Sequence, residues 1–368
     1  MANVINQVFI YIWFMKIVIL GGVAAGAKAA AKARRILPEA EIDLYTDDTH
    51  ISYSSCGLPY YIEGNFEDYR LLLVVSAEEF EKKNVHVHLK NRAMKIIPEA
   101  KQVLIQDLTT QRAYLVDYDK LIIAVGARPI IPKIKNVNLP NVFTLRKIED
   151  GIAIKEMALK SKHATIVGGG YIGVELLEAL VKQNLKVTLV EYSPYIMTTF
   201  DEDMSKLIQE QLNSINNDRF EIVTSEIVTE FSGDINGVKS VKTGTGKEYD
   251  TDFVVLCAGA TPNVEIAKDA GIDLGVTGAI KVNEKMETSI KDIYACGDCV
   301  EEHLVVSNSK IWLPLGSNAN KEGRTAAINA CGGDDKFFGV LGSSVTRCLD
   351  LTMSMTGLTE KRATTLGY

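Results

Sequence analysis

The chain has 368 residues, 46% of them hydrophobic and 24% charged, which is the length of two or three domains and the composition of a globular protein. Its formal net charge of −7 argues against nucleic acid as a partner, because phosphate binding needs a basic surface. Six cysteines in this length do not make a dense disulfide scaffold, so mostly reduced thiols and a cytoplasmic location are expected.

The first predicted segment is an extension over residues 1–14, with an apolar run over 8–14. No basic residue precedes the run and no small-residue cleavage site follows it, so it does not match a signal peptide. It is too short to span a membrane unless it borrows the strand that follows. We expect a loose extension or a start-codon artefact, with a membrane anchor as the alternative. No other segment is a candidate span, so no membrane partner is predicted.

A strand over 16–20 leads into the first glycine motif, Gly21-Gly22-Val23-Ala24-Ala25-Gly26, and an alanine-rich helix is expected over 26–36. Such a turn lets the backbone approach a pyrophosphate closely. The N-terminus of the following helix offers free N–H groups and the positive end of its dipole to that phosphate. The motif therefore predicts a dinucleotide-binding turn.

This first motif departs from the usual pattern in two places. Val23 stands at the middle glycine position. The next strand, over 41–45, is followed by Thr46, where an acidic residue would be usual. Asp47 or its neighbour Asp48 is expected to take over the ribose contact. The alternative is a polar turn with no ligand role.

Cys56 lies beyond that strand, in the loop Ser52-Tyr53-Ser54-Ser55-Cys56-Gly57-Leu58-Pro59-Tyr60-Tyr61. Serine is a good N-cap residue and proline is tolerated in a first helical turn. A helix that starts at Cys56 would point its dipole at the sulfur and lower the thiol pKa. The alternative is an inert buried cysteine. Glycine, proline and serine are poor core residues, so the loop favours a redox role.

A further apolar strand over 121–125 ends in Gly126-Ala127-Arg128-Pro129, and a second unit then repeats the plan. Its glycine motif is Gly168-Gly169-Gly170-Tyr171-Ile172-Gly173. Strands are expected at 164–167, 186–191 and 253–258, and a helix at 171–183. The segment Gly259-Ala260-Thr261-Pro262-Asn263 closes the unit. Alternation of this kind predicts parallel sheets with right-handed crossovers.

Glu191 ends the second strand of this unit, 23 residues after Gly168. A carboxylate there accepts hydrogen bonds from a ribose 2′-OH and repels a 2′-phosphate, which favours NADH over NADPH. The alternative is a surface carboxylate at a strand end. Because the glycine motif lies between a predicted strand and a predicted helix, the binding role is preferred.

A third element, Ile293-Tyr294-Ala295-Cys296-Gly297-Asp298-Cys299, suits a flavin. Glycine allows a close approach, and the Asp298 carboxylate can accept hydrogen bonds from ribityl hydroxyls. Cys296 and Cys299 flank this Gly-Asp pair and are interpreted as incidental small residues. The remaining cysteines, which lie in apolar or small-residue settings and are expected to be structural, are Cys257, Cys331 and Cys348.

Together these segments resemble the pyridine nucleotide–disulfide oxidoreductases, the FAD-dependent family that includes glutathione reductase. The resemblance covers nearly everything from Met15 to the end. It implies an α/β fold with two Rossmann-like dinucleotide-binding domains, for FAD and NAD, and the start of a C-terminal α+β dimerisation domain. The implied boundaries are 15–144 and 263–337 for a discontinuous FAD-binding domain, 145–262 for the NAD-binding domain and 338–368 for a truncated dimerisation domain. A homodimer is expected for the full-length protein and is in doubt for this truncated chain.

The resemblance also implies residue roles. Cys56 and Tyr171 are the catalytic candidates, with Tyr171 covering the flavin face until nicotinamide displaces it. Glu175 is expected to touch the nicotinamide amide. Helix packing and a solvated carboxylate are the respective alternatives. Cofactor binding is assigned to Gly21, Gly22, Ala24, Ala25, Gly26, Asp47, Ser55, Gly126, Arg128, Gly168, Gly170, Tyr171, Ile172, Gly173, Glu175, Glu191, Gly259, Gly297 and Asp298. No metal is assigned, since His86 and His88 lack further ligands nearby.

Cys56 narrows the resemblance to one branch of the family. Two-cysteine members carry Cys-x4-Cys, whereas Tyr61 stands five residues after Cys56. This is similar to coenzyme A-disulfide reductases, NADH oxidases and NADH peroxidases. The loop is most similar to the coenzyme A-disulfide reductases, which usually have Phe and Asn where Tyr53 and Ser55 stand. Oxidases and peroxidases typically carry a histidine where this chain has Ala24.

The predicted function is a relay in which NADH passes hydride to FAD and two electrons then reduce a Cys56 mixed disulfide, releasing a small thiol such as coenzyme A. One alternative is an NADH oxidase or peroxidase that uses a Cys56 sulfenic acid and takes oxygen or peroxide as substrate. Another is an NADH-dependent reductase of a small electron-transfer protein, with Cys56 a bystander.

Overall fold

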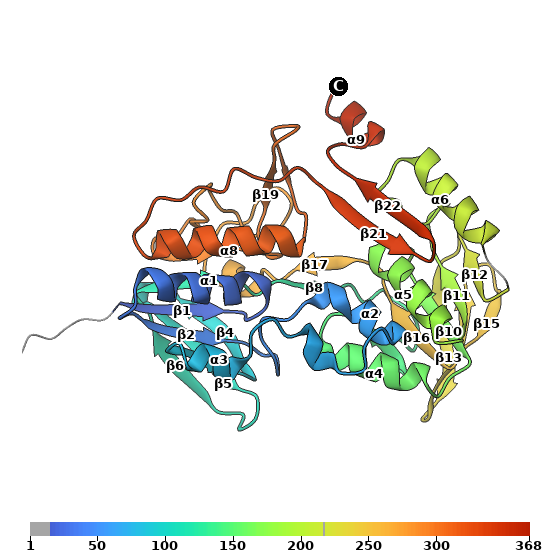
Figure 1. The fold of residues 1–368 in the computed structure, drawn as a ribbon, viewed down its shortest axis with the longest axis horizontal. Coiled ribbons are helices and arrows are strands. Elements are labelled where there is room, and N and C mark those ends of the chain that lie inside the picture. The colour runs from blue at the N-terminus through green and yellow to red at the C-terminus, as the bar shows by residue number, and fades with distance from the viewer. Residues whose placement is uncertain (1–14, 216–217) are drawn as a thin grey trace, which may run out of the picture.

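The computed structural model describes residues 15–215 and 218–368, so the predicted extension over 1–14 lies outside the described residues. The chain folds as an α/β protein built on two five-stranded parallel sheets, as the sequence predicted (Figure 1). Within the described part of the chain, no helix has the length and apolar character needed to cross a membrane.

The first sheet has the strand order β18-β7-β1-β2-β3, with every neighbouring pair parallel. Its strands are β18 (Ile293–Ala295), β7 (Lys120–Ile123), β1 (Lys16–Leu20), β2 (Glu41–Tyr45) and β3 (Val85–His88). Helices α1 (Ala24–Ile36) and α8 (Gly316–Ala330) pack against each other over this sheet (Figure 1). Small residues permit that approach: a Cβ at Gly323 would lie 2.2 Å from the Ala25 carbonyl oxygen.

The second sheet has the order β12-β11-β10-β16-β9, again all parallel, and differs from the first at one edge, where β9 precedes the other strands in the chain and β18 follows them. Its strands are β12 (Phe220–Val223), β11 (Lys186–Val190), β10 (His163–Val167), β16 (Phe253–Leu256) and β9 (Val142–Thr144). Helix α5 (Tyr171–Lys182) follows β10, as α1 follows β1. The central strands β1, β7, β10 and β16 are largely buried, which explains their apolar runs, whereas the edge strands β3 and β9 are only partly buried.

A three-stranded antiparallel insert lies between β3 and β7 in the first half and between β12 and β16 in the second. The inserts are β4 (Asn91–Ile97), β5 (Gln102–Asp107) and β6 (Ala113–Asp117), and β13 (Val228–Asp234), β14 (Gly237–Thr243) and β15 (Glu248–Asp250). The short strands β8 (Ala127–Pro129) and β17 (Ala260–Pro262) pair with each other where the chain crosses between the halves.

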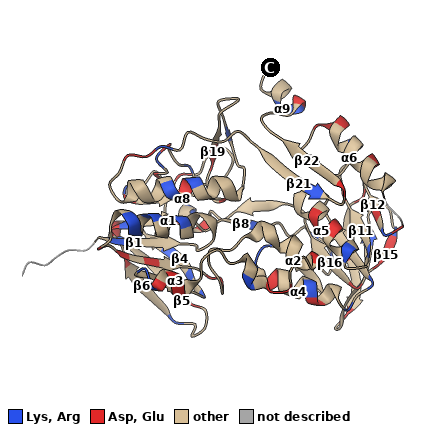
Figure 2. Ribbon diagram, in the orientation of Figure 1, with Lys and Arg blue, Asp and Glu red and all other residues tan. Residues whose placement is uncertain are grey.

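The remaining elements are short. They are η1 (Ser55–Gly57), α2 (Leu58–Glu63), η2 (Tyr69–Leu72), α3 (Ala77–Glu81), η3 (Pro98–Ala100), α4 (Ile148–Ala158), α6 (Glu202–Ser214), α7 (Glu265–Asp269), β19 (Glu302–Leu304), β20 (Ser309–Ile311), β21 (Ser344–Cys348), β22 (Leu351–Met355) and α9 (Glu360–Thr365). Acidic and basic residues are interspersed over both halves rather than gathered by sign (Figure 2).

Two large hydrophobic cores fill the two halves, and the segment after Cys56 belongs to the second one. Leu58 and Ile62 of α2 are fully buried there, together with α5 residues such as Val174 and Leu177. Helix α2 lies between α4 and α5 (Figure 1). The cysteine loop is therefore reached from β2 of the first half but is held by helices of the second.

Candidate functional site

The predicted binding residues gather at the carboxyl ends of the parallel strands, where open α/β sheets bind ligands. Around the first sheet these strand ends carry Gly21, Gly22, Ala24, Ala25, Gly26, Asp47, Gly126, Gly297 and Asp298. Around the second they carry Gly168, Gly170, Tyr171, Ile172, Gly173, Glu175, Glu191 and Gly259. Arg128 is on β8, and Ser55 shares the η1 turn with Cys56.

The first glycine turn is fixed by contacts between strand and helix. Gly21 has φ +104° and donates its N–H to the Tyr45 carbonyl oxygen at 2.7 Å. A Cβ at Gly26 would lie 1.9 Å from the Gly21 carbonyl oxygen, so the helix can sit this close only with glycine there. Helix α1 has no side-chain cap and no acidic residue in its first turn, which leaves its N–H groups to an anion.

The segment around Gly297 and Asp298 lies near the first glycine turn. Gly297 follows β18 with φ +80°, and the Asp298 carboxylate pairs with the Arg146 guanidinium at 3.0 Å. The Asp298 carbonyl oxygen accepts the Trp312 indole N–H at 2.8 Å. Arg146 also approaches Gly126, since a Cβ on that glycine would lie 3.1 Å from its guanidinium. Arg146 thus ties together two turns that the sequence assigned to the flavin, a role that sequence reasoning missed.

The Asp47 carboxylate is engaged with cations. It accepts hydrogen bonds from Arg92 at 3.0 and 3.2 Å and from Lys147 at 3.1 Å. Although burial opposes its charge, Lys147 and then Arg92 hold the pKa of Asp47 below its usual value. Asp48 is more buried than Asp47 and pairs with the same lysine at 2.6 Å. A ribose at Asp47 would therefore share the carboxylate with two cationic side chains.

The second glycine turn repeats the geometry of the first. Gly168 has φ +111° and donates to the Val190 carbonyl oxygen at 2.8 Å. A Cβ at Gly173 would lie 2.0 Å from the Gly168 carbonyl oxygen, whereas one at Gly170 would meet nothing within 4 Å. Helix α5 begins there without a side-chain cap. The open space at Gly170, beside uncapped N–H groups, fits the close approach of a pyrophosphate.

Glu191 lies directly after β11 and is buried, with 6% of its surface exposed. Its two carboxylate oxygens accept the backbone N–H groups of Gly169 at 2.7 Å and Ser193 at 2.8 Å. The alternative of a surface carboxylate at a strand end is therefore wrong. Each oxygen keeps a second lone pair, so the side chain fixes the glycine turn and can still accept a ribose hydroxyl.

Cys56 lies in a 3₁₀ turn, and α2 begins two residues later at Leu58. Ser54 makes no side-chain cap hydrogen bond, so the expected serine cap and the helix start at Cys56 are both wrong. Pro59 occupies the first turn of α2, as expected. The sulfur precedes the helix N-terminus instead of forming part of it.

The charges around Cys56 come from both halves. The side chain reaches solvent, yet loss of hydration and the carboxylates of Glu175 and Asp298 raise the pKa of the thiol. The Arg146 guanidinium and a hydrogen bond with Ser55 oppose this shift. The structure thus contradicts the lowered pKa expected from a helix dipole. Glu175 and Asp298, although distant in sequence, are therefore both near enough to act electrostatically on Cys56.

Tyr171 and Glu175 are both bound by the hairpin β21–β22. The Tyr171 hydroxyl shares a 2.7 Å hydrogen bond with Ser344, and Thr346 donates to Glu175 at 2.7 Å. Burial raises the pKa of Glu175, and the Thr346 hydrogen bond partly offsets the shift. The polar positions of this hairpin were missed, because nothing local in its sequence points to α5.

Three other predicted positions are peripheral in this geometry. Arg128 forms a two-point ion pair with Glu265 at 2.5 and 3.0 Å. Ile172 is 44% exposed on α5, and Gly259 has φ +95° beside β17. These residues flank the crossing between the halves, on the same edge as the glycine turns.

Three of the other thiols are buried, and His88 has an acidic partner. Cys296, Cys299 and Cys348 are buried, and burial raises the pKa of each. His88 stacks on Tyr45 and pairs with Asp43 at 2.7 Å, so an acidic neighbour is present after all. Even so, the described residues contain no group of three or more potential metal ligands.

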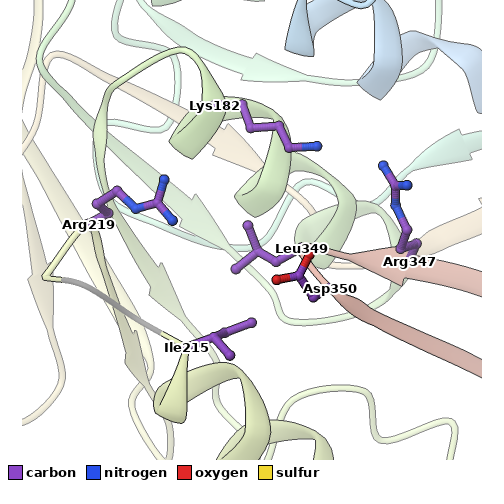
Figure 3. A pocket seen from close by; sticks show the side chains of 6 residues that line it. All are labelled: Lys182, Ile215, Arg219, Arg347, Leu349 and Asp350. Atoms are coloured by element: carbon purple, nitrogen blue, oxygen red, sulfur yellow. The ribbon is translucent and has the colours of Figure 1, made fainter.

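A cavity of about 250 Å³ lies away from these residues, at the far end of α5 (Figure 3). It is lined by Lys182, Ile215, Arg219, Arg347, Leu349 and Asp350. None of the predicted site residues lines it. The Lys182 ammonium pairs with Glu63 of α2 and with Glu178, both at 2.6 Å, so this end of α5 also anchors the cysteine helix.

Comparison with known proteins gives a consistent result. The family described as pyridine nucleotide-disulphide oxidoreductase matches residues 15–323. The NAD(P)H coenzyme A polysulfide/persulfide reductase of Pyrococcus horikoshii is 35% identical over 96% of this chain and 78% of that protein. The NADH oxidase of Methanocaldococcus jannaschii is 34% identical over 94% and 76%.

Among solved structures, reduced Bacillus anthracis CoADR-RHD superposes with a TM-score of 0.91 at 38% identity. The match covers 96% of this chain and 64% of that chain, so the chain spans less than two thirds of the Bacillus protein.

Proposed function

The chain belongs to the pyridine nucleotide-disulphide oxidoreductase family, and on that premise we propose that it uses NADH to reduce a small-molecule disulfide at Cys56, with coenzyme A disulfide as the favoured substrate. The observation that carries this is the position of Cys56: solvent-exposed, at the junction of the two nucleotide-binding halves, and subject to charges from both. A persulfide or polysulfide of the same carrier would suit the same single sulfur.

The chain's residues fit two dinucleotides. The turn at Gly21 to Gly26 and the Asp298 carboxylate are suited to FAD, and the turn at Gly168 to Gly173 with Glu191 to the nicotinamide nucleotide. Bound FAD would supply a two-electron link between nicotinamide and sulfur. Glu191 supports a preference for NADH, since a 2′-phosphate there would face a buried carboxylate.

The sulfur chemistry follows from one reactive thiol. The Cys56 thiolate attacks one sulfur of the substrate disulfide, a bond between the two sulfurs forms, the substrate S–S bond breaks, and one thiolate leaves. Two electrons from NADH then cleave the mixed disulfide, release the second thiol and restore Cys56. Over the cycle, one NADH, one proton and one disulfide become NAD⁺ and two thiols. Arg146 favours the thiolate that begins this cycle.

An NADH oxidase is the second candidate, supported by the similarity to the Methanocaldococcus protein of that name. Cys56 would then cycle through a sulfenic acid, with oxygen or peroxide as the oxidant. A homodimer is proposed for the full-length protein only, because a partner's complete C-terminal domain would complete the disulfide site; light scattering of that protein tests it.

The decisive experiment compares Cys56→Ser with Cys331→Ser, a control that removes a half-buried thiol at the end of α8. With coenzyme A disulfide and NADH, thiol release should fall at least about 100-fold in C56S and stay unchanged in C331S, while both variants keep FAD. Intact mass under non-reducing conditions should show a coenzyme A adduct on Cys56. Full disulfide reduction by C56S would overturn the proposal, and oxygen consumption in excess of thiol release would favour the oxidase.

A further inference from the structure

Two buried carboxyl groups lie behind the Gly297–Asp298 turn. Glu322 is on α8 and is 1% exposed, and Glu302 begins β19 and is 6% exposed. Neither pairs with a lysine, arginine or histidine among the described residues, although buried carboxylates normally need such a partner. The two carboxyl groups instead lie close enough to interact with each other.

The hydrogen bonds of this pair leave one atom on each side unexplained. Glu322 Oε2 accepts the Gly297 N–H at 2.7 Å, and Glu302 Oε2 accepts the Leu313 N–H at 3.1 Å. The Oε1 atoms of both residues are buried and have no hydrogen-bond partner. Two carboxylate oxygens repel each other, but one proton between the groups turns the contact into a hydrogen bond and satisfies both atoms.

We propose that Glu302 and Glu322 form an acid pair that keeps one shared proton at neutral pH and thereby positions the Gly297–Asp298 turn for FAD. The inference rests on the FAD site of the proposed function, but not on the disulfide chemistry. Glu322 is a positioning residue here: it holds the N–H of a glycine whose φ is +80°, next to the carboxylate that is assigned to the flavin.

The surroundings of the pair support a retained proton. Burial is the main cause that raises the pKa of Glu302, followed by the charge on Glu322, and burial also raises the pKa of Glu322. The other ionisable groups that face the pair are Asp298, which is paired with Arg146, and the thiols of Cys296 and Cys299.

None of these neighbours supplies a compensating positive charge to the pair. The two thiols are neutral because burial raises the pKa of each. On α8 the Asn318 amide, which is uncharged, is near Glu302, and the part of α1 nearest to Gly323 is Ala25. The shared proton is therefore the only local group that reduces the negative charge of the Glu302–Glu322 pair among the described residues.

The Gly297–Asp298 turn is held from several sides, so loss of the shared proton would disturb more than one of its contacts. At alkaline pH the pair would carry two negative charges in a buried site, and their repulsion would move Glu322, together with the Gly297 N–H that it holds, away from Glu302. The contacts of Asp298 with Arg146 and Trp312 would then hold it less accurately. FAD affinity should fall as the shared proton leaves, with the protein otherwise folded.

The test measures FAD affinity from neutral to alkaline pH in the wild type, in Glu302→Gln and in Glu301→Gln. Glutamine mimics the protonated acid at position 302, so E302Q should keep its FAD affinity where the wild type loses at least about tenfold. Glu301 is the matched control: it is equally buried but accepts the Thr277 N–H at 2.8 Å and has no part in the pair. E301Q should follow the wild type. A wild-type profile in E302Q would overturn the proposal.

Infrared spectroscopy provides a readout that does not depend on FAD binding or on catalysis. The wild type at neutral pH should show the carbonyl band of a protonated carboxyl group that disappears on raising the pH, and this band should be missing in E302Q and present in E301Q. Absence of the band in the wild type at neutral pH would overturn the proposal even if E302Q failed to fold. If the wild type shows the infrared band but does not reduce the disulfide, the result counts only against the proposed function.

Discussion

The two glycine turns of this chain have nearly the same backbone geometry. Gly21 and Gly168 have φ of +104° and +111°, and a Cβ at either would lie 2.1 or 2.4 Å from the carbonyl oxygen of a neighbouring strand end. Gly26 and Gly173 meet the backbone at 1.9 and 2.0 Å. These four glycines are required by the packing of strand against helix, so they report the fold before they report any ligand.

The turns differ only where a ligand would touch them. Gly170 occupies open space at the second turn, whereas Val23 holds the corresponding place in the first. The strand-end position is the buried Glu191 in one half, and in the other the cation-paired Asp47 follows Thr46. The fold-making positions have been kept in both halves, and the ligand-facing ones have diverged.

The largest loss of stability is expected at Gly26 and Gly173, the glycines that pack in the same way in both turns. Gly26→Ala and Gly173→Ala each place a methyl group inside contact distance of a backbone oxygen, which cannot move without separating strand from helix. Each variant should lose about 3 kcal/mol or more of unfolding free energy, since overpacking of this kind is costly. Urea unfolding followed by circular dichroism measures the loss. Wild-type stability in either variant would refute the packing explanation.

An intermediate effect is expected where the halves diverge. Glu191→Gln would turn an amide NH₂ toward a backbone N–H, because both carboxylate oxygens now accept one. A loss of about 1–3 kcal/mol is expected from that unpaired buried donor. Asp47→Asn is the counterpart in the first half and should cost less than about 1 kcal/mol, as its ion pairs are half-exposed. Urea midpoints of the two variants, and the KM for NADH of E191Q, provide the check. Equal losses would show that the two carboxylates do the same job.

How much of this was predictable depends on distance along the chain. The buried strands and both glycine turns follow from periodicity and motifs, which are local rules, whereas Glu175 was assigned only through the family resemblance. The packing of α2 between α4 and α5 does not follow from such rules, because its apolar residues could have served either core. The raised pKa of the Cys56 thiol was missed for the same reason, since it depends on carboxylates far away in sequence.

The unanticipated polar partners share that origin. Arg146 lies in the connection between the halves, Thr346 in the C-terminal hairpin and Glu322 on a helix more than two hundred residues after the first glycine turn. None belongs to a motif, and each acts on a residue that does. Side chains that support a motif from another part of the chain carry no local pattern, so only the fold can reveal them.

The smallest effect on stability is expected at Gly170, the position where the two glycine turns differ in the space left for a ligand. Its φ is −79°, which any residue adopts, and a Cβ there would meet nothing within 4 Å. Gly170→Ala should therefore leave the unfolding free energy unchanged within about 0.5 kcal/mol. Because the added methyl group would occupy the space left for a pyrophosphate, the KM for NADH should rise while kcat changes little. A stable G170A protein with the wild-type KM would mean that the nucleotide does not approach this turn, and the likeness between the two turns would then extend to the fold alone.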